Sequence, residues 1–323
     1  RATAEAWGLD YNDGGFDTDF HKVITRMGSV QQHHLAFSGG TETQNYRASF
    51  GLMDHNTIVR VNDYRNMVAK IDVTQKAFGG RLTGDFGVFG SSAMTHDIFD
   101  TQMLFNSAAT QNPTYPAGQD ANGNWVKNST AAWINHPGIL LDEKNDSKDA
   151  TLNTHLRLTY DIDSHLHLSL FGAYSYYSTS RAQFCPTWVW AQGNVYRGEF
   201  NGEDYLANAA LNYGNAWGKH KLDASVSGEY HQQLRTGFWV QAKGITTNDF
   251  SYHNIGATSS RPFGGTGSSY EDPSLASLMG SVAYHFDNRY SLSATLRTDG
   301  SSMVGKANTW GVFPSVSGTW NIH

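Results

Sequence analysis

The chain has 323 residues, a formal net charge of −6 and a mean hydropathy of −0.48. Charged residues make up 16 % of it and aromatic residues 13 %, whereas about 25 % of the residues of a soluble domain are charged. The acidic balance leaves no basic surface for nucleic acid, and the single cysteine, Cys185, excludes an internal disulfide framework. The polarity therefore comes from uncharged residues, which suits a β-barrel with a polar interior and an apolar exterior.

Alternation of apolar and polar residues with a period of two dominates the chain. Between residues 152 and 160, leucine and tyrosine lie at even positions, whereas Asn153, His155 and Arg157 lie at odd ones. Successive side chains of a strand point to opposite faces, so the pattern predicts a strand with one apolar face. Similar segments recur, and we expect eleven strands, near residues 31–39, 45–54, 64–74, 81–90, 151–160, 165–177, 205–213, 220–234, 275–286, 289–298 and 312–322.

The connections between these strands alternate in length. Short turns are expected near residues 40–44, 75–80, 161–164, 214–219 and 287–288. Longer loops are expected near residues 55–63, 91–150, 178–204, 235–274 and 299–311. Short turns at one end and long loops at the other are typical of outer-membrane barrels. The sequence therefore predicts an all-β fold, an antiparallel up-and-down transmembrane β-barrel segment.

The apolar faces carry a second signal of a membrane. In the segments with the clearest alternation, no Asp, Glu, Lys or Arg lies on the apolar face, where Lys or Arg at the bilayer midplane would cost about 2–4 kcal/mol. Aromatic residues mark both ends of this face, as interfacial girdles do. They are Tyr160, Tyr213, Phe286 and Tyr290 beside the short turns, and Tyr174, Tyr176 and Tyr230 toward the long loops.

Eleven strands do not close an antiparallel barrel of even strand number. Two unpaired edges in lipid would leave backbone N–H and C=O groups without partners. We therefore expect the chain to be part of a larger protein, with residues 1–30 forming an extracellular or connecting segment and residues 31–323 forming part of a barrel.

Two stretches of the chain carry specific motifs. The first has GGTE at 39–42, NY at 45–46 and GLMD at 51–54. The second has YSLSATLRTDGSS at 290–302 and WGVFPS at 310–315. They resemble the early barrel and the mid-barrel signature of SusC-like (RagA-like) TonB-dependent transporters. The resemblance extends from about residue 16 onward. It departs at Met303-Val304, where the family has an aromatic residue.

The resemblance implies a fold, an activity and partners. It implies a barrel of 22 strands, of which this chain has about 11, in a Bacteroidota-type outer membrane. It also implies import of oligosaccharides or peptides powered through TonB, with a SusD-like surface lipoprotein capping the barrel. The family's plug domain, through which TonB would act, has no counterpart in the chain.

The expected outer loops are rich in aromatic residues. Rings supply contact area at low entropic cost and can stack on sugars, but they can equally pack the loops together or meet a partner protein. The candidate substrate or partner contacts are Trp125, Trp133, Trp188, Trp190, Tyr196, Phe238 and Trp239.

No enzymatic, cofactor or metal site is expected. His155, His165 and His167 lie on matching faces of neighbouring strands, but neither a carboxylate nor a thiol completes a metal site, and nothing identifies a base for Cys185. Two other functions remain open: a passive porin or surface adhesin with the same wall, and a soluble β-rich carbohydrate-binding protein or hydrolase. A sequence upstream with a plug would favour the transporter, and a stable monomer in water without detergent would favour the soluble protein.

Overall fold

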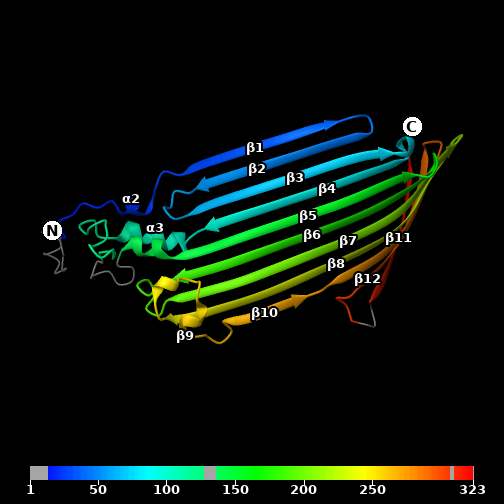
Figure 1. Ribbon diagram of the computed structural model, residues 1–323. Coiled ribbons are helices and arrows are strands. Elements are labelled where there is room, and N and C mark those ends of the chain that lie inside the picture. Colours follow the sequence, from blue (N-terminus) through cyan, green and yellow to red (C-terminus); the bar gives the residue numbers. More distant parts are fainter. Residues whose placement is uncertain (1–13, 127–135, 306–308, 323) are drawn as a thin grey trace.

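The computed structural model describes residues 14–126, 136–305 and 309–322, and its main feature is one curved antiparallel sheet (Figure 1). The strands are β1 (Ser29–Gly40), β2 (Gln44–Asn56), β3 (Asp63–Ala77), β4 (Leu82–His96), β5 (Lys144–Asp161), β6 (Leu166–Cys185), β7 (Asn194–Trp217), β8 (His220–Ile245), β9 (Thr258–Ser260), β10 (Thr266–Glu271), β11 (Ser274–Phe286), β12 (Tyr290–Ser301) and β13 (Trp310–Trp320). The helices are α2 (Phe20–Ile24) and α3 (Thr101–Thr110), with 3-10 turns η1 (Phe78–Gly80), η2 (Pro137–Asp142), η3 (Asn248–Phe250) and η4 (Ile255–Ala257).

The sheet follows the chain order, which confirms the predicted up-and-down arrangement. Its path runs through β1 to β8 and then β11, β12 and β13, eleven strands, while β9 and β10 pair only with β8. In Figure 1 the strands lie obliquely side by side, and β11 and β12 turn away from the plane of the first strands, so the sheet curls. This is part of a barrel wall.

β10 and β11 both pair with β8, and they do so in the same register. Glu271 pairs with Arg235, and Ser274 pairs with Gln232. Pro273 lies at the break, where its carbonyl accepts a hydrogen bond of 2.9 Å from the Gln233 amide. Proline has no backbone N–H, so Pro273 cannot donate the second hydrogen bond of this residue pair. The two strands are therefore one long strand interrupted by a proline.

The connections differ between the two ends of the sheet. At the end that we call the turn end, tight connections join the strands. There Asp287 and Asn288, in the three-residue connection 287–289, both have positive φ, +54° and +52°, as the central residues of a type I′ turn do. At the opposite end, the loop end, lie the 97–143 and 246–273 connections, and α2 and α3 lie there too (Figure 1).

Five strands, β4 to β8, extend farther toward the loop end than the alternation predicts, and β6, β7 and β8 are the longest of them. β6, β7 and β8 have 20, 24 and 26 residues, whereas about 9–11 residues suffice to cross a membrane. The expected loop at 178–204 shrinks to 186–193, and the expected loop at 235–274 begins only after Ile245. The prediction was wrong here because the apolar alternation stops while the backbone ladder continues.

The two faces of the sheet have opposite chemistry. We call the face that carries His167, Asn212 and Asp223 the inner face, and the face that carries Leu170 and Val226 the outer face. The registers of β5 to β8 are unbroken along their whole lengths, so each side chain keeps its face. Large apolar residues of the outer face are exposed, including Leu35, Phe50, Leu170, Val226, Leu278 and Leu296.

Charged groups bound the apolar band of the outer face at the loop end. Arg65 and Asp54 form an ion pair of 2.6 Å across β2 and β3. Tyr174 and Tyr205 contact each other, with ring centroids 5.0 Å apart, and Glu203 is the next residue of β7 on the same face toward the loop end. At the turn end the rings of Tyr290 and Trp320 stack at 6.2 Å. An apolar band between aromatic borders matches the lipid-facing side of a barrel.

The most compact hydrophobic cluster lies at the loop end. It joins α2, α3 and η2 through buried residues that include Ile24, Leu104 and Leu140. Asp19 caps α2 by accepting hydrogen bonds from two amides of its first turn. Among the helices of the described residues, none is long and apolar enough to cross a membrane.

Candidate functional site

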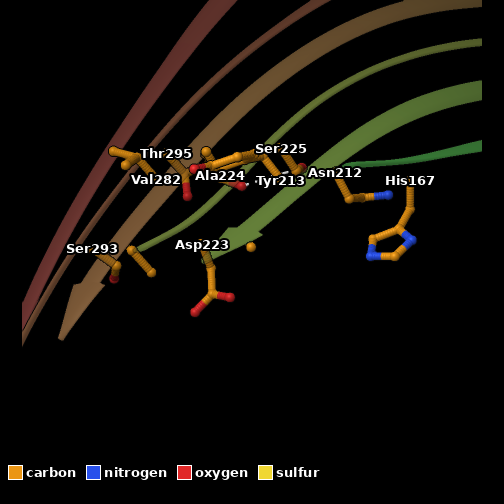
Figure 2. A pocket seen from close by; sticks show the side chains of 12 residues that line it. His167, Asn212, Tyr213, Asp223, Ala224, Ser225, Val282, Ser293 and Thr295 are labelled. Carbon is orange, nitrogen blue, oxygen red and sulfur yellow. Dashed lines mark hydrogen bonds between the residues drawn. The ribbon is translucent and has the colours of Figure 1, made fainter. Parts of the chain in front are cut away.

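A polar hollow of about 430 Å³ lies on the inner face, near the turn end of β6 to β8, β11 and β12. Figure 2 shows His167, Asp223 and Ser293 pointing to the concave side of the curved sheet. His167 Nδ1 lies 2.7 Å from Asp161 Oδ1, and His285 Nε2 lies 3.7 Å from Asp223 Oδ2. The inner face is therefore a wall of polar groups that water and hydrated solutes can solvate.

The three histidines considered for a metal do not meet. His155 lies near the ring of Phe171, His165 Nδ1 lies 3.1 Å from the Gly214 carbonyl, and His167 contacts Asp161. In the part of the chain that the structure describes, no group of three or more His, Cys, Asp or Glu residues is arranged to hold a metal.

Two of the predicted aromatic contacts anchor the loop end. Trp125 and Trp188 both donate their indole N–H to Asp142 Oδ2, at 3.1 and 2.9 Å. Trp125 also stacks on the buried His136, with ring centroids 5.0 Å apart. Burial raises the pKa of Asp142, and the two indoles oppose that rise. This cluster ties the 97–143 connection to the 186–193 connection.

A second carboxyl lies buried beside this cluster. The Cys185 thiol donates to Glu143 Oε1 at 3.7 Å, and both residues are buried. Burial raises the pKa of Glu143 to about 7, although a hydrogen bond from the Phe99 backbone opposes the rise. Burial also raises the pKa of Cys185, which makes the thiol a poor nucleophile.

The remaining predicted contacts lie in different places. Trp190 lies in the 186–193 loop and is exposed. Tyr196, Phe238 and Trp239 lie on strands, so their expected location in outer loops was wrong. Tyr196 and Trp239 are on the inner face, whereas Phe238 is on the outer face. Trp133 lies outside the described residues.

Sequence reasoning missed two inner-face aromatics. Phe200 lies beside Trp239, with ring centroids 6.3 Å apart and ring planes 17° apart. Tyr177 lies across from Gly202 in the β6–β7 register. The signal that could have found them is the alternation of Tyr196, Gly198, Phe200 and Gly202, which continues the strand period through a segment read as loop.

No protein-family model matches the chain. Two curated proteins are similar over 98 % of it: TonB-dependent receptor P3 of Formosa agariphila, at 28 % identity, and TonB-dependent receptor SusC of Bacteroides thetaiotaomicron, at 27 %. The chain covers 33 % and 34 % of these proteins, so it spans about a third of the length of the curated relatives it matches.

Solved structures show the same fold. The similarity to the RagAB peptide importer in its open-open state covers 96 % of this chain and 35 % of the importer's chain, with a TM-score of 0.74 and 18 % identity. The similarity to the ferric citrate transporter FecA covers 90 % of this chain and 38 % of the FecA chain, with a TM-score of 0.54 and 8 % identity.

The fold, the two faces and the similar proteins agree on one class of protein: the chain resembles the wall of a TonB-dependent receptor barrel. Within that class, the similarity to SusC and P3 supports the SusC-like family, which confirms the resemblance seen in the sequence motifs. The assignment implies the outer membrane of a Gram-negative bacterium, and the similar proteins are named as receptors and transporters.

Proposed function

We propose that the chain forms about half of the barrel wall of a SusC-like importer that takes oligosaccharides or peptides across a Bacteroidota-type outer membrane. In this proposal residues 31–323 are the wall and residues 1–30 are an extracellular or connecting segment. The observation that carries the proposal is the two-faced curled sheet, apolar outside and polar inside, in chain order. Such a wall separates lipid from a hydrated passage.

The proposal includes two protein partners. A SusD-like surface lipoprotein would cover the loop end, where Trp188 and Trp190 are exposed. TonB would supply the energy through a plug domain of the whole receptor. The similarity to SusC and to the RagAB structure supports both partners, and RagAB, a peptide importer, supports the peptide alternative.

Gene deletion and uptake measurement test this function in the source bacterium. Removal of the receptor that contains this chain should abolish growth on one class of oligosaccharide or peptide and leave growth on its monomers intact. Uptake should stop when the proton-motive force is dissipated. Uptake that persists without that force would indicate a passive porin, and unchanged growth on every such nutrient would favour an adhesin.

A further inference from the structure

Four aromatic residues of the inner face form a strip on the loop-end halves of β6, β7 and β8. The strip consists of Tyr177, Tyr196, Phe200 and Trp239. Their common face follows from the unbroken registers, in which Tyr196 pairs with Gln241 and Phe200 with Gly237. The strip lies on the same face of the sheet as the polar hollow, nearer to the loop end.

Glycines hold these rings flat against the sheet. A side chain at Gly202 would collide with the ring of Tyr177, one at Gly237 with Phe200, and one at Gly267 with Trp239. Each ring thus lies over the backbone of a neighbouring strand, where only glycine leaves room for it. The ring planes of Phe200 and Trp239 are nearly parallel, at 17°. The strip therefore presents π-faces toward the passage rather than ring edges.

A cavity of about 540 Å³ adjoins the strip at its loop end. It is lined by Phe99 and Trp190 and by the polar side chains Asn194, Gln241 and Lys243. Gln241 Nε2 donates to Asn194 Oδ1 at 2.9 Å. Gln241 also lies directly across from Tyr196 in the register, so cavity and strip are continuous.

Two cations of this surface have no counter-ion. Arg181 and Lys243 are exposed on the inner face, and within the described ranges neither makes an ion pair. Arg181 lies in one row with Gly198 and Trp239. Two carboxyls, Asp149 and Asp204, also lie on the inner face, where Asp149 accepts a hydrogen bond from Thr179 at 2.7 Å. Among the described residues that line the cavity, Lys243 is the one that carries a charge, so the cavity end of the surface favours an anion.

We propose that the strip and the adjoining cavity are a binding site for an acidic oligosaccharide. The inference rests on the proposed import function and specifies the class of substrate that is imported. The apolar faces of pyranose rings stack on Phe200 and Trp239, the amides of Gln241 and Asn194 bind hydroxyls, and Arg181 and Lys243 bind carboxylate or sulfate groups along the chain. Charge-assisted bonds of this kind are the strong ones.

Flat rings and unpaired cations favour a sugar over a peptide. An extended peptide is bound chiefly through main-chain hydrogen bonds to a sheet edge, and the strip lies on a sheet face whose backbone groups are already paired. An acidic peptide is therefore the rival that the experiment must separate.

The test measures binding to the intact receptor in detergent by titration calorimetry. The probes are hexagalacturonate, its methyl ester with the same rings and no charge, a sulfated galactan oligosaccharide, and an acidic hexapeptide. We expect at least one anionic oligosaccharide to bind, and methyl esterification or desulfation to weaken binding about tenfold or more, as loss of a charged hydrogen bond does. The two anionic probes distinguish a carboxylate ligand from a sulfate ligand.

Matched variants locate the site. Trp239→Ala and Phe200→Ala should each weaken binding about tenfold or more, whereas Phe238→Ala, one residue away on the opposite face, should change it less than twofold. Arg181→Gln and Lys243→Gln should abolish the preference for the charged probe, and the outer-face control Arg197→Gln should not. Equal effects of Trp239→Ala and Phe238→Ala, binding indifferent to charge, tighter binding of the peptide, or no binding of either anionic oligosaccharide would each overturn the inference. Energy-dependent uptake that survives Trp239→Ala would leave the import function standing and refute only this site.

Discussion

Glu143 is the residue whose protonation matters most to the loop end. Its carboxyl is buried between the Cys185 thiol and the Phe99 backbone. Burial favours the neutral form, which places its pKa near 7 rather than at the ordinary 4.5. The closed loop end therefore binds this proton more tightly than an opened one does.

The stability of the loop end should consequently fall as pH rises. The stabilisation is complete below pH 4.5, the ordinary pKa, and is lost as pH rises through about 7, the pKa of the folded state. Hydrogen exchange of residues 97–105, corrected for intrinsic rates, should be slower at pH 5.5 than at pH 8 in the intact receptor. Glu143→Gln should remove this dependence. The same pH dependence in both proteins would contradict the role assigned to Glu143.

Asp142 acts at the same place by accepting two indole hydrogen bonds. Asp142→Ala leaves both Trp125 and Trp188 without their acceptor, and each unmade bond costs about 1 kcal/mol. We expect more rapid proteolysis in the 97–143 connection and a red shift of tryptophan fluorescence. Unchanged proteolysis would mean that the apolar contacts around His136 hold the connection alone.

At the scale of elements, β8 shows best how one strand serves two environments. Val226 is on the outer face and is 58 % exposed, whereas its neighbour Ser225 lines the inner hollow. Val226→Arg should lower the free energy of unfolding in lipid vesicles by about 2–4 kcal/mol. Ser225→Arg, beside Asp223, should cost far less. Equal costs for the two arginines would contradict a lipid-facing outer side.

The β10–β11 break makes a separate prediction. Pro273→Val restores an N–H that can donate to Gln233, completing a hydrogen-bonded pair of which one bond already exists. Hydrogen exchange across residues 271–275 should become slower, with stability unchanged or raised by up to about 1 kcal/mol. Exchange that stays as fast as in the unmodified protein would mean that β10 and β11 are separate strands.

The sequence predicts strands best where they separate two solvents. The segment from Leu152 to Tyr160 is correctly predicted as a strand because lipid and water favour different side chains on its two faces. Beyond the membrane both faces of β7 and β8 meet polar surroundings, so the continuous apolar face on which the strand prediction depended ends there. The segments that contain Tyr196 and Trp239 were therefore predicted as loops. The contact of Trp125 and Trp188 with one carboxylate joins residues far apart in the chain, which no local pattern reveals.

At the scale of the whole molecule, a transporter wall needs an inner face open to solutes and an outer face in lipid. β8 crosses the band with Leu222, Ala224, Val226, Gly228 and Tyr230 on the outer face and the odd-numbered residues between them on the inner one. The environment of these two sets of side chains separates a transporter wall from a soluble sheet.

The decisive measurement places a nitroxide label at each position from 222 to 230 in the intact receptor, on a Cys185→Ser background, reconstituted in bilayers. Collision rates with oxygen, which partitions into lipid, should peak at even positions. Rates with a water-soluble nickel complex should peak at odd positions, with a period of two. Uniform nickel accessibility along the strand, or oxygen maxima at the odd positions, would contradict the barrel wall described above.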